Sequence, residues 1–245
     1  MENSDKSSEK AIEISVIVPA YNEETRLKPT ILEIDQYLSS KQVNYEIIIV
    51  DDGSTDGTAV LIKELAKNNP NIKPISSQKN YGKGHAVRSG MLAAAGEYVI
   101  FADADGATPF AEIERLLAAM RRGVALAIGS RALPSRETKV KTYFYRKLMG
   151  RVFNAVANLI LIPGIADTQC GFKMFTRNAA QEIFSRATIN RYAFDLEILF
   201  LARKLNFPIA EVPINWINKP GSKINLLTDS AKMLFELIKI RLRHL

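Results

Sequence analysis

Short apolar runs alternate with amphipathic segments over the first half of the chain. The runs are rich in Ile and Val and end close to Pro, Asp or Gly, a pattern typical of buried strands. The segments between them carry apolar residues at helical spacing and begin near Asn, Asp or Thr, which favour helix starts. The pattern predicts strands at 14–18, 46–50, 73–76, 98–102 and 124–128, and helices at 23–39, 57–67, 84–95 and 110–122.

Strands that alternate with helices in this order form a parallel sheet with helices on both faces. We therefore predict an α/β fold built on a mostly parallel sheet. Beyond residue 129 the pattern is less regular, with a basic loop at 132–142, a short strand at 172–175 and a strand at 207–214 that two prolines restrict to a sheet edge. Helices are expected at 143–162, 178–186, 194–204 and 228–243, and the first and last of these are amphipathic.

Composition is that of a soluble globular protein. The chain has 245 residues, of which 47% are hydrophobic, enough to bury a substantial core. Its one cysteine, Cys170, excludes an internal disulfide. The longest uncharged stretch, residues 152–166, is shorter than the roughly 18–20 residues that a membrane-spanning helix needs. Residues 1–11 are polar, lack the apolar centre of a signal peptide, and are expected to form a disordered leader.

A net charge of +7 favours anionic partners, either nucleic acid, an anionic membrane surface or a phosphorylated substrate. No aromatic-interleaved RNA-reading motif accompanies the basic residues, so we expect no nucleic-acid partner. The helices at 143–162 and 228–243 each combine an apolar stripe with Lys and Arg, as interfacial helices do. Peripheral binding to a membrane is therefore expected, with ordinary core packing of the same stripes as the alternative. The sequence gives no signal for an oligomeric state.

The strand at 98–102 runs directly into Asp103-Ala104-Asp105. Residues two apart on a strand point the same way, so both carboxylates leave its carboxyl end on one side, roughly 6–7 Å apart. Ligands of open α/β sheets bind at this edge, and two unpaired carboxylates there would repel each other. A divalent cation that bridges to a diphosphate, Mg²⁺ or Mn²⁺, would resolve the repulsion. A solvated acidic turn is the alternative.

The strand at 46–50 ends at a second acidic turn, which begins with Asp51 and Asp52. A calcium loop is excluded because the twelfth position counted from Asp52 is Lys63 instead of Glu. We expect Asp51 or Asp52 to accept hydrogen bonds from a nucleobase or ribose at the sheet edge. Residues 82–85, Gly-Lys-Gly-His, lack the third glycine of a dinucleotide fingerprint, which would stand at Val87. They remain a candidate basic turn near a diphosphate.

Three segments that follow successive strands, residues 19–23, 51–58 and 103–105, resemble the family-2 inverting glycosyltransferases with the GT-A fold. Later segments narrow the resemblance to dolichyl- or polyprenyl-phosphate β-glucosyltransferases, with dolichyl-phosphate mannose synthases more distant. These segments are Gly129–Arg131, Asp167–Phe175, Arg191–Glu197 and Asn215–Trp216. The resemblance implies a GT-A domain over 12–225, after the leader at 1–11, with a C-terminal amphipathic helix in 226–245.

The implied reaction transfers glucose from UDP-glucose to a polyprenyl or dolichyl phosphate with inversion, on the cytoplasmic face of a membrane. Transfer of mannose from GDP-mannose, transfer to a saccharide hydroxyl, and a nucleotide-sugar-binding module without turnover are the alternatives. The N-terminal segment departs from the family pattern. The eukaryotic glucosyltransferases carry an N-terminal membrane helix, whereas residues 1–11 of this chain contain no apolar segment. A peripherally bound prokaryotic enzyme would fit this departure.

The resemblance also implies which residues bind the donor. Asp105 would be the main metal ligand, and Asp103 would lie near the ribose or the sugar and share the metal. Lys223 would face the donor diphosphate. The uridine pocket would be lined by Pro19, Ala20, Tyr21 and Glu23, with Asp52 near the base.

On the acceptor side, the resemblance implies that Arg131 and Arg146 hold the lipid phosphate, for which the guanidinium fork is suited. A phosphate monoester, whose second pKa is near 6, is already largely ionised at neutral pH. A strong general base is therefore not required, and catalysis would depend on positioning and charge neutralisation. Asp195 is the candidate base if one is used, and Glu197 lies in the same motif.

Overall fold

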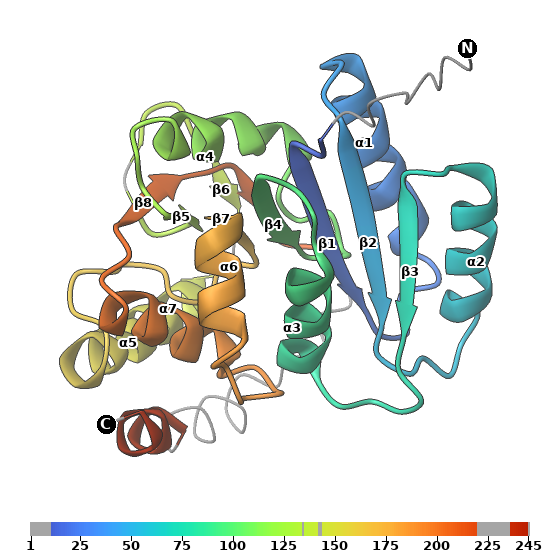
Figure 1. The fold of residues 1–245 in the computed structure, drawn as a ribbon. Helices are drawn as coiled ribbons and strands as arrows, with labels where there is room; N and C mark the ends of the chain where they lie inside the picture. The colour runs from blue at the N-terminus through green and yellow to red at the C-terminus, as the bar shows by residue number, and fades with distance from the viewer. Residues whose placement is uncertain (1–10, 134, 142–143, 220–235, 245) are drawn as a thin grey trace, which may run out of the picture.

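The computed structural model describes residues 11–133, 135–141, 144–219 and 236–244. Its centre is a seven-stranded sheet with the strand order β3-β2-β1-β4-β7-β5-β8 (Figure 1). Strand β7 is antiparallel to its neighbours β4 and β5, and the other paired strands of this sheet are parallel. The strands are β1 (Ile14–Ala20), β2 (Tyr45–Asp51), β3 (Ile72–Ser76), β4 (Tyr98–Ala102), β5 (Leu126–Ser130), β7 (Phe172–Thr176) and β8 (Ile209–Pro213).

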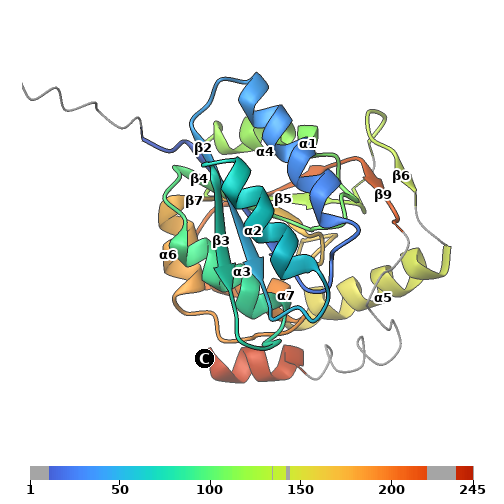
Figure 2. The same ribbon diagram turned by 90° about the vertical axis from the view of Figure 1, so that its right-hand side faces the viewer.

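Helices cover both faces of the sheet, because alternate residues of the buried strands point to opposite sides (Figure 2). Ile17 and Val50 face a core formed with α3, α5, α6, α7 and the helix at 236–243. Val18 and Ile49 face a second core, formed with α1, α2 and α4. The helices are α1 (Leu27–Ser40), α2 (Thr58–Asn68), α3 (Lys83–Ala93), α4 (Ile113–Met120), α5 (Phe144–Ile160), α6 (Arg177–Phe184) and α7 (Phe194–Lys204), with a 3₁₀ turn η1 (Phe110–Glu112) before α4.

The predicted mostly parallel α/β sheet is confirmed, and β8 lies at the sheet edge as its prolines indicated. The predicted start of the first helix at residue 23 is wrong, since α1 begins at Leu27. Asn22 has a φ of 53°, and its side-chain oxygen accepts a hydrogen bond from the backbone N–H of Thr55 at 2.8 Å. It therefore ties two loops together and does not cap a helix.

A second, two-stranded sheet pairs β6 (Val140–Lys141) with β9 (Trp216–Ile217) in parallel. The sequence predicted only a loop at 132–142, because neither strand is long enough to show a period. The backbone N–H of Ile217 donates to the carbonyl of Ala107 at 2.9 Å. The small sheet is thereby joined to the acidic loop that follows β4.

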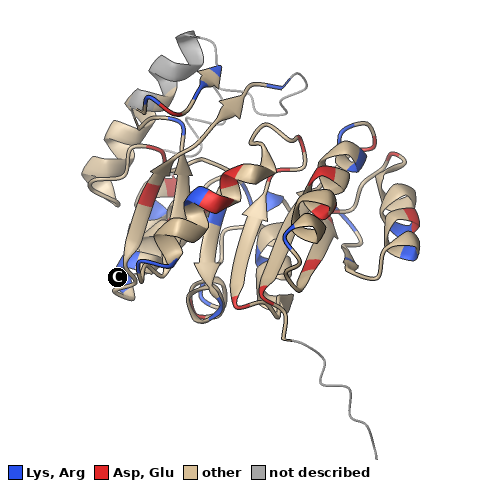
Figure 3. Cartoon of the chain, turned by 90° about the horizontal axis from the view of Figure 1, so that it is seen from above, with Lys and Arg blue, Asp and Glu red and all other residues tan. Residues whose placement is uncertain are grey.

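Within the described ranges, no helix has the length and apolar character needed to cross a bilayer. The helix at 236–243 falls inside the amphipathic helix predicted for 228–243, whose first part lies outside the described residues. Residues 1–10 of the predicted leader also lie outside them. Acidic and basic residues are interspersed among the helices and strands seen in Figure 3.

Candidate active site

A cleft with a volume of about 600 Å³ opens at the carboxyl ends of β1, β2 and β4. Strands β1, β2 and β3 run toward this edge, the lower one in Figure 1. The opposite wall comes from the start of α3 and from the loop before α7. The lining residues are Pro19, Ala20, Tyr21, Glu23, Arg26, Asp52, Asn80, Gly82, Lys83, Asp103, Ala104, Asp105, Arg191 and Tyr192.

Asp52 fixes the turn that leads into α3. Its carboxylate oxygens accept hydrogen bonds from the backbone N–H groups of Tyr81, at 3.0 Å, and Gly82, at 2.7 Å. Gly82 has a φ of +110°, and a side chain there would collide with the carbonyl of Asn190. Asp52 thus lines the cleft and holds the turn that brings Lys83 into it. Its binding to a nucleobase or ribose stays a prediction.

Three predicted site residues are not among the described residues that line the cleft: Asp51, Asp195 and Arg131, the last of which lies beside it. Asp51 is buried, and one carboxylate oxygen accepts the backbone N–H of Ser54 at 3.0 Å, so it shapes the turn after β2. Asp195 is buried on α7 and forms an ion pair with the ammonium of Lys173, which also donates to the carbonyl of Cys170 at 2.6 Å. Its carboxylate is held by Lys173 rather than presented to the cleft.

The acidic loop after β4 brings three charges together. Lys83 donates to Asp103 at 2.5 Å, and Asp105 accepts the backbone N–H of Ala107 at 3.0 Å. Burial alone would lower the pKa of Lys83, but the charges of Asp103 and Asp195 raise it above its ordinary value. Burial raises the pKa of Asp105, and the negative charge of Asp103 raises it further. Burial and the neighbouring carboxylate therefore both disfavour the charged form of Asp105.

This arrangement fits a divalent cation. The described residues contain no group of three or more His, Cys, Asp or Glu side chains placed to hold a metal by themselves. Mg²⁺, however, commonly uses one or two carboxylates together with phosphate oxygens and water. Asp105, with Asp103 beside it, supplies such an incomplete ligand set at the edge of a cleft that is large enough for a nucleotide.

Beside the cleft, Arg131 is held in a fixed orientation. Its Nε and Nη2 atoms donate to the two carboxylate oxygens of Asp167 at 2.7 and 2.8 Å. The ring of Trp216 lies 5.4 Å from the guanidinium carbon. Burial would lower the pKa of Arg131, but the charges of Asp167 and, more weakly, Asp103 raise it. The side chain keeps 30% of its surface exposed, so the remaining N–H groups can reach a ligand.

Several cleft residues were not predicted. Arg26 makes a bidentate ion pair with Glu23, and both N···O distances are 2.7 Å. This pair was not predicted, because an Arg three residues after a Glu is common on helix surfaces. Asn80, Arg191 and Tyr192 reach the cleft through loop geometry that no local pattern encodes. Arg191 and Tyr192 do lie in the segment Arg191–Glu197, one of those that carried the family resemblance. That segment was the one feature of the sequence that could have predicted their place in the cleft. Arg146 lies on α5 with its side chain outside the described part, and Lys223 lies outside the described residues.

A family model named Glycosyl transferase family 2 matches residues 15–184. The chain belongs to glycosyl transferase family 2. Its relatives in this family include a dolichyl-phosphate beta-glucosyltransferase of Dictyostelium discoideum, 41% identical over 96% of this chain and 75% of the relative. The human protein of the same name is 40% identical over 95% of this chain and 76% of its own length.

Solved structures of other proteins share the fold. Glucosyl-3-phosphoglycerate synthase from Mycobacterium tuberculosis, solved with Mn²⁺, uridine-diphosphate and glucosyl-3-phosphoglycerate, superposes with a TM-score of 0.67. The likeness covers 95% of this chain and 79% of that one at 21% identity, which supports the fold alone. The same enzyme solved with Mg²⁺ and uridine-diphosphate also gives a TM-score of 0.67. These structures confirm the predicted GT-A fold. The predicted membership of the family-2 glycosyltransferases is confirmed by the family model and the relatives.

Proposed function

We propose that this glycosyltransferase moves glucose from UDP-glucose to a polyprenyl phosphate of the dolichyl type, with inversion. The observation that carries the proposal is the meeting of opposite charges at one sheet edge: the acidic pair Asp103 and Asp105 in the cleft, and the oriented cation Arg131 beside it. Acidic residues suit a metal-bound diphosphate donor, and a fixed guanidinium suits a phosphate acceptor. Two relatives that match nearly the whole chain are dolichyl-phosphate beta-glucosyltransferases by name.

In the proposed step, an oxygen of the acceptor phosphate attacks the anomeric carbon of glucose from the face opposite the donor diphosphate. The bond between that carbon and the diphosphate oxygen breaks, and its electron pair leaves on UDP. The acceptor oxygen is already ionised at neutral pH, so no proton has to be removed. The buried ion pair between Asp195 and Lys173 supports transfer without a general base. A carboxylate held in this pair is a poor base for an acceptor in the cleft.

On the donor side, Asp105 and Asp103 would hold Mg²⁺ or Mn²⁺. Such an ion, when bound, would neutralise charge on the departing diphosphate. Pro19, Ala20, Tyr21 and Glu23 line the part of the cleft proposed for uridine, with Asp52 beside it. Lys83 places a charged amine among the acidic residues, where it can keep Asp103 oriented and contact a phosphate oxygen. Lys223 remains a further proposed diphosphate ligand.

On the acceptor side, Asp167 and Trp216 would hold Arg131 ready before the lipid arrives, so that little side-chain entropy is lost on binding. Arg146, on α5, is the second proposed phosphate ligand. We further propose that the chain binds peripherally to the cytoplasmic face of a membrane. Leu159 on α5 is 86% exposed, and Leu242 on the helix at 236–243 is 67% exposed. The two helices lie next to each other, because Arg241 donates to the carbonyl of Ile160 at 2.7 Å.

The direct test supplies polyprenyl phosphate with labelled UDP-glucose, GDP-mannose or UDP-N-acetylglucosamine in parallel and counts the label that enters the lipid extract. Label from UDP-glucose alone is the expected result. Label from GDP-mannose alone would replace the proposed donor, and binding of UDP-glucose without any transfer would make the chain a binding module. Arg131→Lys, which keeps the charge but loses the two-pronged geometry, should lose transfer to the lipid much more than it loses affinity for UDP.

A hydroxyl acceptor makes a different prediction. A saccharide hydroxyl has a far higher pKa than a phosphate and needs a base, so Asp195→Asn would then abolish transfer while Arg131→Ala would have a modest effect. The membrane proposal is tested by sedimentation with anionic liposomes, which should carry the protein down at low salt and release it at high salt. Indifference to both the liposomes and the salt would remove that part of the proposal.

A further inference from the structure

The loop before α7 is held by a carboxylate that the proposed reaction does not use. Glu197, on α7, is fully buried and accepts four hydrogen bonds. One oxygen accepts the backbone N–H groups of Thr188, at 2.9 Å, and Ile189, at 2.7 Å. The other oxygen accepts the Thr188 hydroxyl, at 2.8 Å, and lies 2.8 Å from Nε2 of His244. Because a carboxylate only accepts, the His244 ring must donate this bond.

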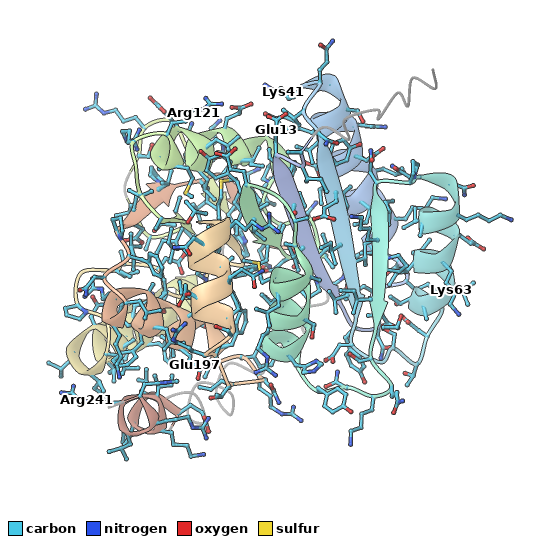
Figure 4. All side chains as sticks on the ribbon, in the orientation of Figure 1. Glu13, Lys41, Lys63, Arg121, Glu197 and Arg241 are labelled. Carbon is cyan, nitrogen blue, oxygen red and sulfur yellow. The ribbon has the colours of Figure 1, made fainter. Side chains whose placement is uncertain are left out.

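The helix at 236–243 therefore contacts the loop from outside. Arg243 adds a second link, because its guanidinium donates to the Thr188 hydroxyl at 2.8 Å. The helix itself is anchored independently: Leu237 and Ile240 are buried in the core, and Arg241 bonds to the end of α5. Figure 4 labels Glu197 and Arg241 at the lower end of the molecule, where α7 lies near this helix. Removing the Arg243 or His244 side chain would thus leave the helix anchored.

The same loop forms one wall of the donor cleft. The carbonyl of Asn190 accepts the backbone N–H of His85 at 3.1 Å, and Arg88 donates to the Asn190 side chain at 3.1 Å. These bonds fasten the loop to the start of α3, from which Lys83 reaches Asp103. The next residue, Arg191, lines the cleft. A guanidinium at this place suits a diphosphate.

We propose that Arg243 and His244 are positioning residues, which hold the loop at 187–192 through Thr188 and Glu197 and so keep Arg191 directed at the donor diphosphate. This inference rests on the proposed uridine-diphosphate donor, but not on the proposed sugar or acceptor. Its consequence is that residues on a peripheral helix set the affinity of the cleft for the donor. Neither of them is among the described residues that line the cleft.

The test measures the affinity of the full chain for UDP, with its divalent cation, by calorimetry, and separately KM for UDP-glucose and kcat. His244→Ala should weaken UDP binding and raise the donor KM about tenfold, the size expected for losing a buried bond to a charged group, with kcat changed by less than about threefold. Arg243→Ala should act in the same direction. His244→Gln, whose amide can still donate to Glu197, should recover most of the affinity. Arg186→Ala is the matched control, since it removes an exposed ion pair with Glu182 next to the same loop.

Two further measurements separate positioning from a general loss of structure. Amide hydrogen exchange should rise in a peptide covering 186–192 in His244→Ala and stay unchanged in the Arg186 control. In an Arg191→Ala background, His244→Ala should cost no further affinity, because the two changes remove the same interaction. Equal UDP affinity in His244→Ala and the parent chain, or fully additive losses in the double variant, would overturn the proposal. UDP binding without glucose transfer to lipid phosphate would instead refute the proposed function alone.

Discussion

Replacing Gly171 with alanine tests whether transfer depends on the position of the Asp103 carboxylate. Gly171 precedes β7, and its carbonyl accepts the backbone N–H of Asp103 at 3.1 Å. A methyl carbon added to Gly171 would lie 2.1 Å from Oδ2 of Asp103 and 2.4 Å from Oδ1. Ordinary van der Waals contact begins at 3.4 Å, so the carboxylate would have to retreat by more than 1 Å.

A displacement of about 1 Å at a reacting centre can cost about 100-fold in rate, and we expect a loss of this size in kcat/KM for glucose transfer. The backbone should tolerate the change, since Gly171 is not one of the described glycines with a positive φ. The thermal midpoint should therefore move by no more than about 3 °C, which corresponds to about 1 kcal/mol in a chain of this size. Loss of activity without loss of stability is the expected signature.

The assay follows labelled glucose into the lipid extract over a range of UDP-glucose concentrations. Gly150→Ala is the matched control, because a methyl group there would meet no described atom within 4 Å, and it should keep full activity. If Gly171→Ala transfers glucose within about threefold of the parent rate, the position of Asp103 beside Lys83 is not required. The assignment of the acidic pair to the donor would then be refuted.

Three other outcomes are expected. Asp105→Asn should reduce the rate of glucose transfer at least about 100-fold. A chelator should abolish transfer by the parent chain until Mg²⁺ or Mn²⁺ is added back. Full activity in the presence of chelator would refute the proposed metal requirement. Burial acts to raise the pKa of Asp167, but the ion pair with Arg131 lowers this pKa below its ordinary value. The free energy of unfolding that this pair contributes should therefore be complete above about pH 4 and should fall as the pH drops below it. In Asp167→Asn, the free energy of unfolding measured with urea should not show this fall at low pH. If the variant and the parent chain gave the same dependence of this free energy on pH, the ion pair would not contribute to stability. Burial raises the pKa of Cys170 to about 12, so iodoacetamide at pH 8 should neither label the folded protein nor slow transfer, and rapid labelling would show that the thiol is accessible.

The alternation of apolar runs was sufficient to predict the strands and the mostly parallel sheet, because a strand buried on both faces leaves a local signature. It also placed Asp103 and Asp105 just beyond the carboxyl end of β4, because the apolar run stops at Ala102. The two-residue period of a strand does not extend to Asp105, which lies in a turn. The cleft residues Pro19 to Glu23 were found through the resemblance. Their roles in binding remain predictions.

Tertiary structure decided which charges meet. Asp195 is separated by 22 positions from Lys173, and only the insertion of β7 antiparallel beside β4 brings that amine under α7. The same insertion places Gly171 against Asp103. Arg191 enters the cleft because Glu197 and His244 hold its loop, through contacts spanning as many as 47 positions. The sequence by itself determined the strands of the large sheet and the faces they bury, because those depend on neighbouring residues; it missed the short strands β6 and β9. Pairing between distant strands and neutralisation of buried charges depend on contacts between residues far apart in the sequence. The local spacing of apolar and polar residues does not predict such contacts.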